Sequence, residues 1–336
     1  MANNITLAKN YIDLLDEVYK QASVTSDLTG DSTMMRAGAN VNEISYPQIS
    51  VTGLGDYDRN SGYTDGAVTL SWVTTTFNYD RGTKITVDTM DDQETFNLAF
   101  GKAGATLQRD KVAPEADAFT FATLAGIDGI SKATAATYAD ATEFLAALLD
   151  AKNKMDEDEV PEEGRILYAT PTLVNGLMEL DTTKSKEVFN SFGVVKKVPQ
   201  TRFYTAIDLL DGKSEGEKLG HYQKAKATYK ASTDVTVDSA KTYYTYNSGV
   251  YTVVSNPTGN PSTSGYYEME TAGGKDINFM IIHKPAIIKF DKHVTGNIIA
   301  PENNPDSDAY ILKYRKYGIV DVYKNKVAGI YLSHKA

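Results

Sequence analysis

The chain has 336 residues, of which 41% are hydrophobic and 23% are charged, and its formal net charge is -10. This is an ordinary globular composition, and the acidic balance argues against a surface that wraps duplex nucleic acid. The absence of cysteine excludes disulfides, thiolate metal ligands and cysteine nucleophiles. No apolar run reaches the roughly 18 residues of a membrane helix, and the N-terminus lacks a signal-peptide pattern, so we expect no membrane association and no secretion.

The first elements are a helix-patterned arm and a long hairpin. Residues 5–19 place apolar side chains on one helical stripe, and the polar stretch 23–38 predicts a loosely tethered arm. Residues 41–51 and 67–79 then alternate as β-strands around a turn-rich tip, and the β pattern continues at 83–88. A two-stranded ribbon is marginal alone and has open edges, so we expect another surface to cover it.

Helices are predicted in the middle of the chain. Asp91 begins a pattern that continues to about Lys111, Pro114 suits the first turn of a further helix, and Asp140 has capping spacing before another helix. Residues 165–170 predict a strand that leads into a helix at Pro171.

Long strands dominate the C-terminal third. Pro285 divides two apolar strands within 277–293, and residues 309–332 are almost entirely strand-like. These elements predict an α+β fold with long antiparallel strands.

Residues 212–275 differ in composition from the rest of the chain. They are rich in Ser, Thr and Gly, carry eight of the 22 tyrosines, and contain a hairpin signal around Asn247, Ser248 and Gly249. Glycine-containing hinges flank the stretch, which predicts a segment inserted into a loop.

No pattern for a catalytic or metal site emerges. The four histidines lack metal-site spacing, and the acidic run 156–163 lacks the ligand order of a calcium loop. Nucleophile elbows, phosphate loops and dinucleotide fingerprints are missing from the sequence. We therefore expect no catalytic residue, no metal, no cofactor and no enzyme activity.

Several sequence segments resemble those of one protein family. They are "LSWVTTTFNYDRGTKITVDTMDDQET", "KVAPEADAFTFATLA", "VPEEGRILYATPTLV", "INFMIIHKPAIIKFDKH" and "APENNPDSDAYILKYRKYGIVDVYKNKVAGIY". Together with the order of elements, they resemble tailed-phage major capsid proteins of the Hong Kong 97 type, in a branch from phages of Gram-positive hosts.

The resemblance implies a domain plan. It places an N-terminal arm at 1–40, an extended loop at 41–90, a peripheral domain with a spine helix at 91–135 and 301–336, and an axial domain at 136–211 and 276–300. The stretch 212–275 would be an inserted β-rich surface domain.

The resemblance also implies function and partners. The chain would assemble with itself into pentamers and hexamers of an icosahedral shell, enclosing double-stranded DNA without sequence specificity. A separate scaffolding protein and a portal are expected, and a decoration protein is left open. The protein would reside in the virion after assembly in the bacterial cytoplasm. The lysine, asparagine and glutamate that cross-link the type member have no match here, so no cross-link is expected.

Candidate assembly contacts follow from this assignment. They lie in the arm and in the extended loop: Tyr11, Leu15, Tyr57, Arg59, Tyr63, Trp72, Phe77 and Arg81.

Two other functions remain open. An encapsulin-like nanocompartment would keep the fold but hold cargo enzymes, and the contents of the particle would decide. A tail or surface protein could instead bind glycans through the Tyr-rich insert, although doublets such as Tyr243 and Tyr244 alternate faces on a strand, so that half would belong to a small core.

Overall fold

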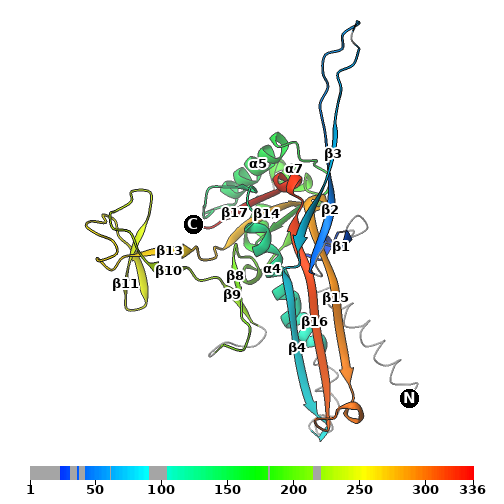
Figure 1. Cartoon of the computed structure of the whole chain (residues 1–336), viewed down its shortest axis with the longest axis vertical. Coiled ribbons are helices and arrows are strands. Elements are labelled where there is room, and N and C mark those ends of the chain that lie inside the picture. Colours follow the sequence, from blue (N-terminus) through cyan, green and yellow to red (C-terminus); the bar gives the residue numbers. More distant parts are fainter. Residues whose placement is uncertain are drawn as a thin grey trace. The chain divides into compact units, whose positions relative to one another are not determined.

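The computed structural model describes residues 23–30, 36–37, 42–60, 62–90, 104–180, 182–214 and 221–336. They form two compact units (Figure 1). The first contains the described residues up to Pro114 with Glu159–Ile166 and Ile282–Ile330, and the second contains Glu115–Asp158, Leu167–Ile281 and Tyr331–Ala336. This division differs from the expected domain borders, for example in placing residues 115–135 in the second unit and residues 282–300 in the first.

The first unit contains two antiparallel sheets, each of three strands, in the orders β1-β2-β3 and β15-β16-β4. Their strands are β1 (Arg36–Ala37), β2 (Glu43–Val51), β3 (Val68–Thr76), β4 (Tyr79–Asp88), β15 (Ile287–Ile299) and β16 (Ala309–Val322). β15 and β16 pair over almost their whole length, with an irregularity between Asp291 and His293. This pairing confirms the long C-terminal strands.

The sequence pattern suggested that β4 continues the hairpin, but it does not. It pairs with β16, from Tyr79 opposite Gly318 to Asp88 opposite Ala309. Asn78 marks the change of sheet, because its side chain both donates to the carbonyl oxygen of Val320 at 2.8 Å and accepts from its amide at 3.1 Å. The two sheets therefore share a chain segment but not a hydrogen-bonded ladder.

A small core joins the two sheets of the first unit. It consists of Ile44, Tyr46, Ile288 and Ile319, with Val73, Phe77, Phe290 and Tyr323 packed against it. Across the same contact, the hydroxyl of Thr75 donates to the carboxylate of Asp321 at 2.5 Å. The base of the hairpin is thus fixed to β15 and β16.

Residues 23–30 are attached more firmly than the polar sequence predicted. They include a short 3-10 helix, Ser26–Leu28, whose Leu28 is fully buried. The buried amine of Lys289 donates to the Thr25 carbonyl at 3.0 Å, and the amide of Gly30 donates to the Lys289 carbonyl at 3.0 Å. A buried amine requires acceptors, and this segment supplies them. The predicted arm helix at 5–19 lies outside the described residues.

The helix expected to end near Lys111 continues instead. Its described part begins at Gly104, passes through a π-helical turn at Gln108–Val112, and continues as α4 (Ala113–Ala125). Pro114 cannot donate to the carbonyl four residues earlier, and a π-turn accommodates such a lost bond without ending the helix. Residues 91–103 of the predicted spine helix lie outside the described residues.

The second unit is built on a five-stranded sheet in the order β5-β17-β14-β6-β7. Its strands are β5 (Ser131–Lys132), β6 (Arg165–Ala169), β7 (Val194–Lys197), β14 (Ile277–His283) and β17 (Ile330–His334). β6 and β14 are buried at every position, as their mostly apolar sequences predict, although Arg165, Asn278 and His283 are buried with them. The unit also contains most of α4, whose Phe121 meets Tyr168 of β6 at 5.2 Å, and the helices α5 (Ala141–Glu157), α6 (Pro171–Glu179) and α7 (Thr183–Asn190).

The start of α5 confirms the capping prediction. The carboxylate of Asp140 accepts from the amides of Thr142 at 2.8 Å and Glu143 at 2.9 Å. Glu143 accepts in return from the amide of Ala139 at 2.8 Å. The buried stripe Phe144, Leu145, Leu148, Ala151 and Met155 follows on one face. α6 likewise begins with Pro171 in its first turn.

Residues 206–274 leave the second unit's sheet and return to nearly the same point. They carry β8 (Ile207–Leu209), β9 (Tyr222–Lys224), β10 (Thr228–Ala231), β11 (Tyr243–Asn247), β12 (Val250–Val253) and β13 (Tyr267–Thr271). At the junction, Thr205 donates its amide to Lys275 at 2.9 Å, and Lys275 donates its amide to the Thr205 hydroxyl at 2.8 Å. The excursion thus begins at Ala206, before the expected border at residue 212.

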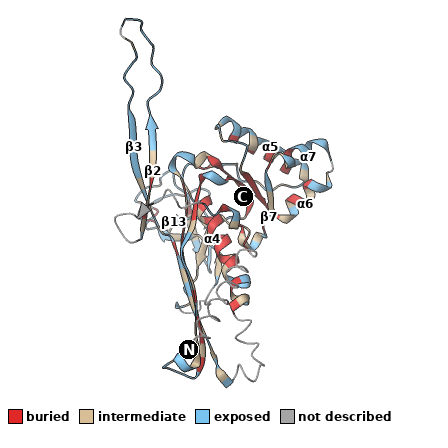
Figure 2. Cartoon of the chain, turned by 90° about the vertical axis from the view of Figure 1, so that its right-hand side faces the viewer, coloured by how far each residue is buried: buried red, intermediate tan, exposed pale blue. Residues whose placement is uncertain are grey.

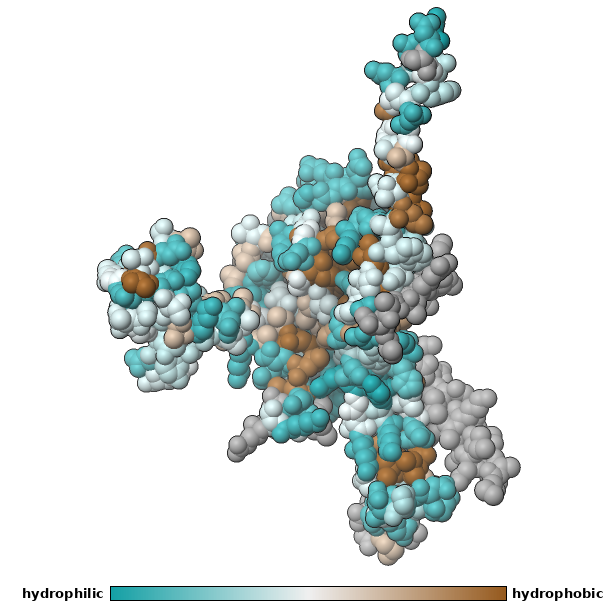
Figure 3. All heavy atoms as spheres, in the orientation of Figure 1, coloured by the Kyte–Doolittle hydropathy of each residue, from teal (hydrophilic) through white to brown (hydrophobic). Residues whose placement is uncertain are grey.

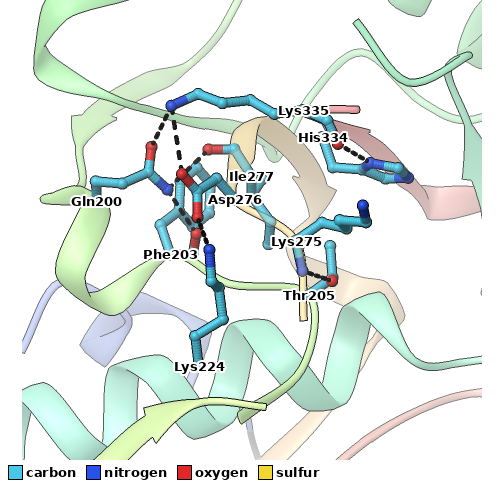
Figure 4. Close-up of polar contacts among 9 residues, drawn as sticks. All are labelled: Gln200, Phe203, Thr205, Lys224, Lys275, Asp276, Ile277, His334 and Lys335. Atoms are coloured by element: carbon cyan, nitrogen blue, oxygen red, sulfur yellow. Dashed lines mark hydrogen bonds and ion pairs between the residues drawn. The ribbon is translucent and has the colours of Figure 1, made fainter. Parts of the chain in front are cut away.

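Charged side chains hold this junction, which we call the root (Figure 4). The Asp276 carboxylate pairs with Lys224 of β9 at 3.1 Å and with Lys335 near the C-terminus at 3.5 Å. Lys335 also donates its amide to the Asp276 carbonyl at 2.8 Å. A Cβ on Gly274 would lie 2.2 Å from the carbonyl oxygen of Ala206. The two chain segments at the root can approach this closely only because residue 274 is glycine.

We expect His283 to make stability depend on pH. Its side chain is buried, and burial lowers its pKa below 6.5, with the positive charges of Lys326 and Arg165 adding to that effect and a hydrogen bond to the Glu163 backbone opposing it. Because the folded-state pKa of His283 is lowered, its contribution to stability is fully present above the unfolded-state pKa. That contribution is lost as the pH falls below the unfolded-state pKa.

Thermal melting between pH 7.5 and 5.5 checks this prediction. The melting temperature of the unmodified chain should fall across that range, and His283→Gln should reduce the fall, whereas the exposed His293→Gln should not. Equal slopes for all three proteins would contradict the role of His283.

Candidate assembly interface

The apolar residues of the β2–β3 hairpin change faces along its length. Near the base, Ile44 and Tyr46 belong to the first unit's core. Farther along β2, the apolar residues are Pro47, Ile49 and Val51. Because successive strand residues point to opposite faces, these three point away from the face that Ile44 and Tyr46 occupy. The first unit's core therefore covers Ile44 and Tyr46 but cannot also cover Pro47, Ile49 and Val51.

The pairing register extends this outward set across both strands. Trp72 lies opposite Pro47, Leu70 opposite Ile49, and Val68 opposite Val51. We call these six residues the outer stripe. Ile49, Val51, Val68, Leu70 and Trp72 are 64%, 65%, 70%, 56% and 46% exposed. Figure 2 shows the hairpin as exposed over its outer part, and Figure 3 shows hydrophobic surface gathered over its strands.

The other face of the same ribbon is polar beyond the core. Gln48 lies opposite Ser71, and Ser50 lies opposite Thr69. One face can therefore remain in water while the other loses water to a partner. Burying a Val, Leu or Ile side chain contributes about 1.5–3 kcal/mol, so the outer stripe can supply a substantial part of an association energy.

The hairpin tip is locally ordered. Asp58 and Gly62 exchange backbone hydrogen bonds of 3.2 and 2.7 Å, and Gly62 adopts a φ of 80°. The rings of Tyr57 and Tyr63 lie 4.8 Å apart and are 60% and 88% exposed. Arg59 is also exposed. The structure thus brings these three expected contact residues together at the tip.

Phe77 and Arg81 lie apart from the outer stripe. Phe77 was expected to find its partners in a neighbouring subunit, but its ring stacks on Tyr317 at 4.7 Å and meets Phe290 at 5.8 Å within its own unit. Arg81 is half-buried in β4 opposite Lys316. Tyr11 and Leu15 lie outside the described residues. Of the expected contacts, Trp72 alone belongs to the outer stripe.

The other residues of the stripe were missed at the sequence level. Ile49, Val51, Val68 and Leu70 share alternate positions with Pro47 and Trp72. That alternation was visible in the sequence, but the face that packs against β15 and β16 was not. The sequence therefore indicated an intermolecular contact for the hairpin as a whole, but it did not show which of its apolar residues face outward.

The described residues were also searched for metal ligands and for membrane-spanning helices. Among the described residues, no cluster of three or more His, Asp or Glu side chains could hold a metal ion. In the same part of the chain, no helix has the length and apolar character needed to cross a bilayer.

The fold is similar to solved phage structures. A structure of Mycobacterium phage Che8 aligns with a TM-score of 0.50 and 15% identity, covering 93% of this chain and 90% of that one. The capsid structure of the cyanophage P-SCSP1u also aligns with a TM-score of 0.50, at 12% identity, covering 94% of this chain and 88% of that one. The chain has a phage capsid fold.

A virus-like particle from Pyrococcus furiosus aligns at a TM-score of 0.49 and 11% identity, covering 95% of each chain. No protein-family model and no curated protein matches the sequence. Because the sequence identities are only 12–15%, the alignments with the phage structures show a similar fold and nothing more. The capsid fold and the outer stripe are independent observations on the same chain.

Proposed function

We propose that this protein is a structural major capsid protein that assembles with itself into an icosahedral phage head enclosing double-stranded DNA. The observation that carries the proposal is the outer stripe, an apolar face turned away from its own core, on a chain with a phage capsid fold. A neighbouring copy would cover this face, and repeated contacts of that kind close into rings and shells. The role is structural, with no reaction catalysed.

The domain plan is part of the proposal. The extended loop (41–90) lies across a neighbouring subunit, and the first and second units correspond to the peripheral and axial domains of the Hong Kong 97 type. The 206–274 excursion is an inserted domain on the outer surface of the capsid. A scaffolding protein and a portal act during assembly in the bacterial cytoplasm, and the protein ends in the virion.

Sedimentation of the chain, alone and with its scaffolding protein, tests the proposal. We expect particles of megadalton size with the scaffold, because the outer stripe requires neighbours. A discrete dimer or tetramer that persists across concentrations with scaffold present would contradict a shell. The contents of purified particles distinguish a phage head, which holds DNA, from a nanocompartment, which holds cargo protein.

A further inference from the structure

A group of tyrosine rings covers one face of the four-stranded sheet in the excursion. The sheet has the order β10-β13-β11-β12. Tyr229 stacks on Tyr251 with centroids 3.9 Å apart, and its ring also meets Tyr244 at 4.9 Å. Tyr251 meets Tyr246 at 4.8 Å and Tyr267 at 5.3 Å. These five residues, which we call the tyrosine face, come from all four strands.

The charged residues of this small domain gather elsewhere. Lys241 pairs with Asp234 at 2.8 Å and with Glu268 at 3.2 Å. The buried Tyr243 donates its hydroxyl to Asp234 at 2.6 Å. Tyr243 and Glu268 are neighbours in sequence of Tyr244 and Tyr267, so they point to the opposite side of the sheet. On the tyrosine side, the cross-strand partners are the uncharged Val253 and Met269.

The tyrosine face also presents hydroxyl groups. None of its five phenol hydroxyls makes a hydrogen bond to any residue that the structure describes. Tyr246 is 52% exposed, so this residue is accessible at the surface. The surface therefore combines aromatic rings with hydrogen-bonding groups and carries no charge.

The size of the face limits what can bind there. Strands lie about 4.8 Å apart and rise about 3.4 Å per residue, so four strands over three residues cover on the order of 200 Å². A stable protein interface needs about 800 Å² from each partner. A ligand of two or three sugar rings fits this area, whereas a folded protein partner would need more.

We propose that the tyrosine face binds a neutral glycan. Sugar rings would pack their C–H faces on the exposed ring of Tyr246 and its neighbours, and sugar hydroxyls would bond to the phenol hydroxyls. The stacking of Tyr229 on Tyr251 fixes the platform before binding, which lowers the ordering cost of association. Without a cation on this face, an acidic sugar would lose hydration of its carboxylate with no compensation. The proposal does not depend on shell formation, because the face lies within one chain.

A glycan array probed with the labelled full-length chain tests this assignment, using neutral glycans and anionic glycans of equal length. We expect saturable binding to neutral glycans and little or none to anionic ones. Titration calorimetry with the strongest neutral glycan then compares variants. Tyr246→Ala should weaken binding about tenfold, the scale of one lost aromatic contact.

Two variants make the result specific. Tyr246→Phe keeps the ring and loses the hydroxyl, so it should weaken binding less than Tyr246→Ala. Val250→Ala removes an exposed apolar side chain from the opposite face of β12 and should leave affinity unchanged. The proposal is overturned if no neutral glycan binds, if anionic glycans bind as tightly, or if both Tyr246 variants bind like the unmodified chain.

Discussion

Leu70→Asp is expected to abolish shell formation while leaving the subunit folded. Leu70 lies at the centre of the outer stripe, opposite Ile49, and 56% of it is exposed. In the free subunit the new carboxylate remains in water, so folding loses little. In a shell each copy would bury an unpaired charge, which costs several kcal/mol per contact, and the cost recurs at every subunit.

Thr69→Asp is the matched control. Thr69 precedes Leu70 on the same strand, is also exposed, and lies on the polar face opposite Ser50. It should assemble normally, because its face can remain in water. Electron microscopy and sedimentation with the scaffolding protein measure assembly, and thermal melting measures folding. Normal shells from Leu70→Asp, or equal failure of both variants, would refute the role of the outer stripe.

Removal of residues 207–273 is expected to leave a folded, assembly-competent subunit. Thr205 and Lys275 are already paired by two hydrogen bonds, so a short Gly/Ser linker can replace the excursion without moving either end. The five-stranded sheet takes all its strands from outside the deleted range. The entropic cost of closing a loop depends only weakly on its length, so the shorter linker changes this cost little.

The deletion has two measurable consequences. Its particles should lack outer protrusions in cryo-electron microscopy, and its melting temperature should remain close to that of the unmodified chain. A deletion at the sequence-based border, 213–274, leaves β8 without its partner β9. This variant should be less stable than the 207–273 deletion. A 207–273 deletion that fails to fold as a monomer would show that the excursion is part of the core.

Elements that depend on neighbouring residues could be predicted from the sequence alone. The cap at Asp140, the proline start of α6 and the turn at Ser248 and Gly249 were all predicted, and in that turn both residues have positive φ, as a two-residue hairpin requires. The buried runs at β6 and β14 were also visible. Each of these signals acts over a few residues, so it can be read without the rest of the chain.

Features that join residues far apart in the sequence became visible in the folded chain. β4 pairs with β16 across more than 200 positions of sequence, and Phe77 finds Phe290 and Tyr317 in its own unit. The outer stripe became distinguishable from a core stripe when Ile44 and Tyr46 were seen packed against Ile288 and Ile319. Alternation shows that a strand has two faces, but which face is buried depends on what packs against it, and here that surface comes from the other end of the chain.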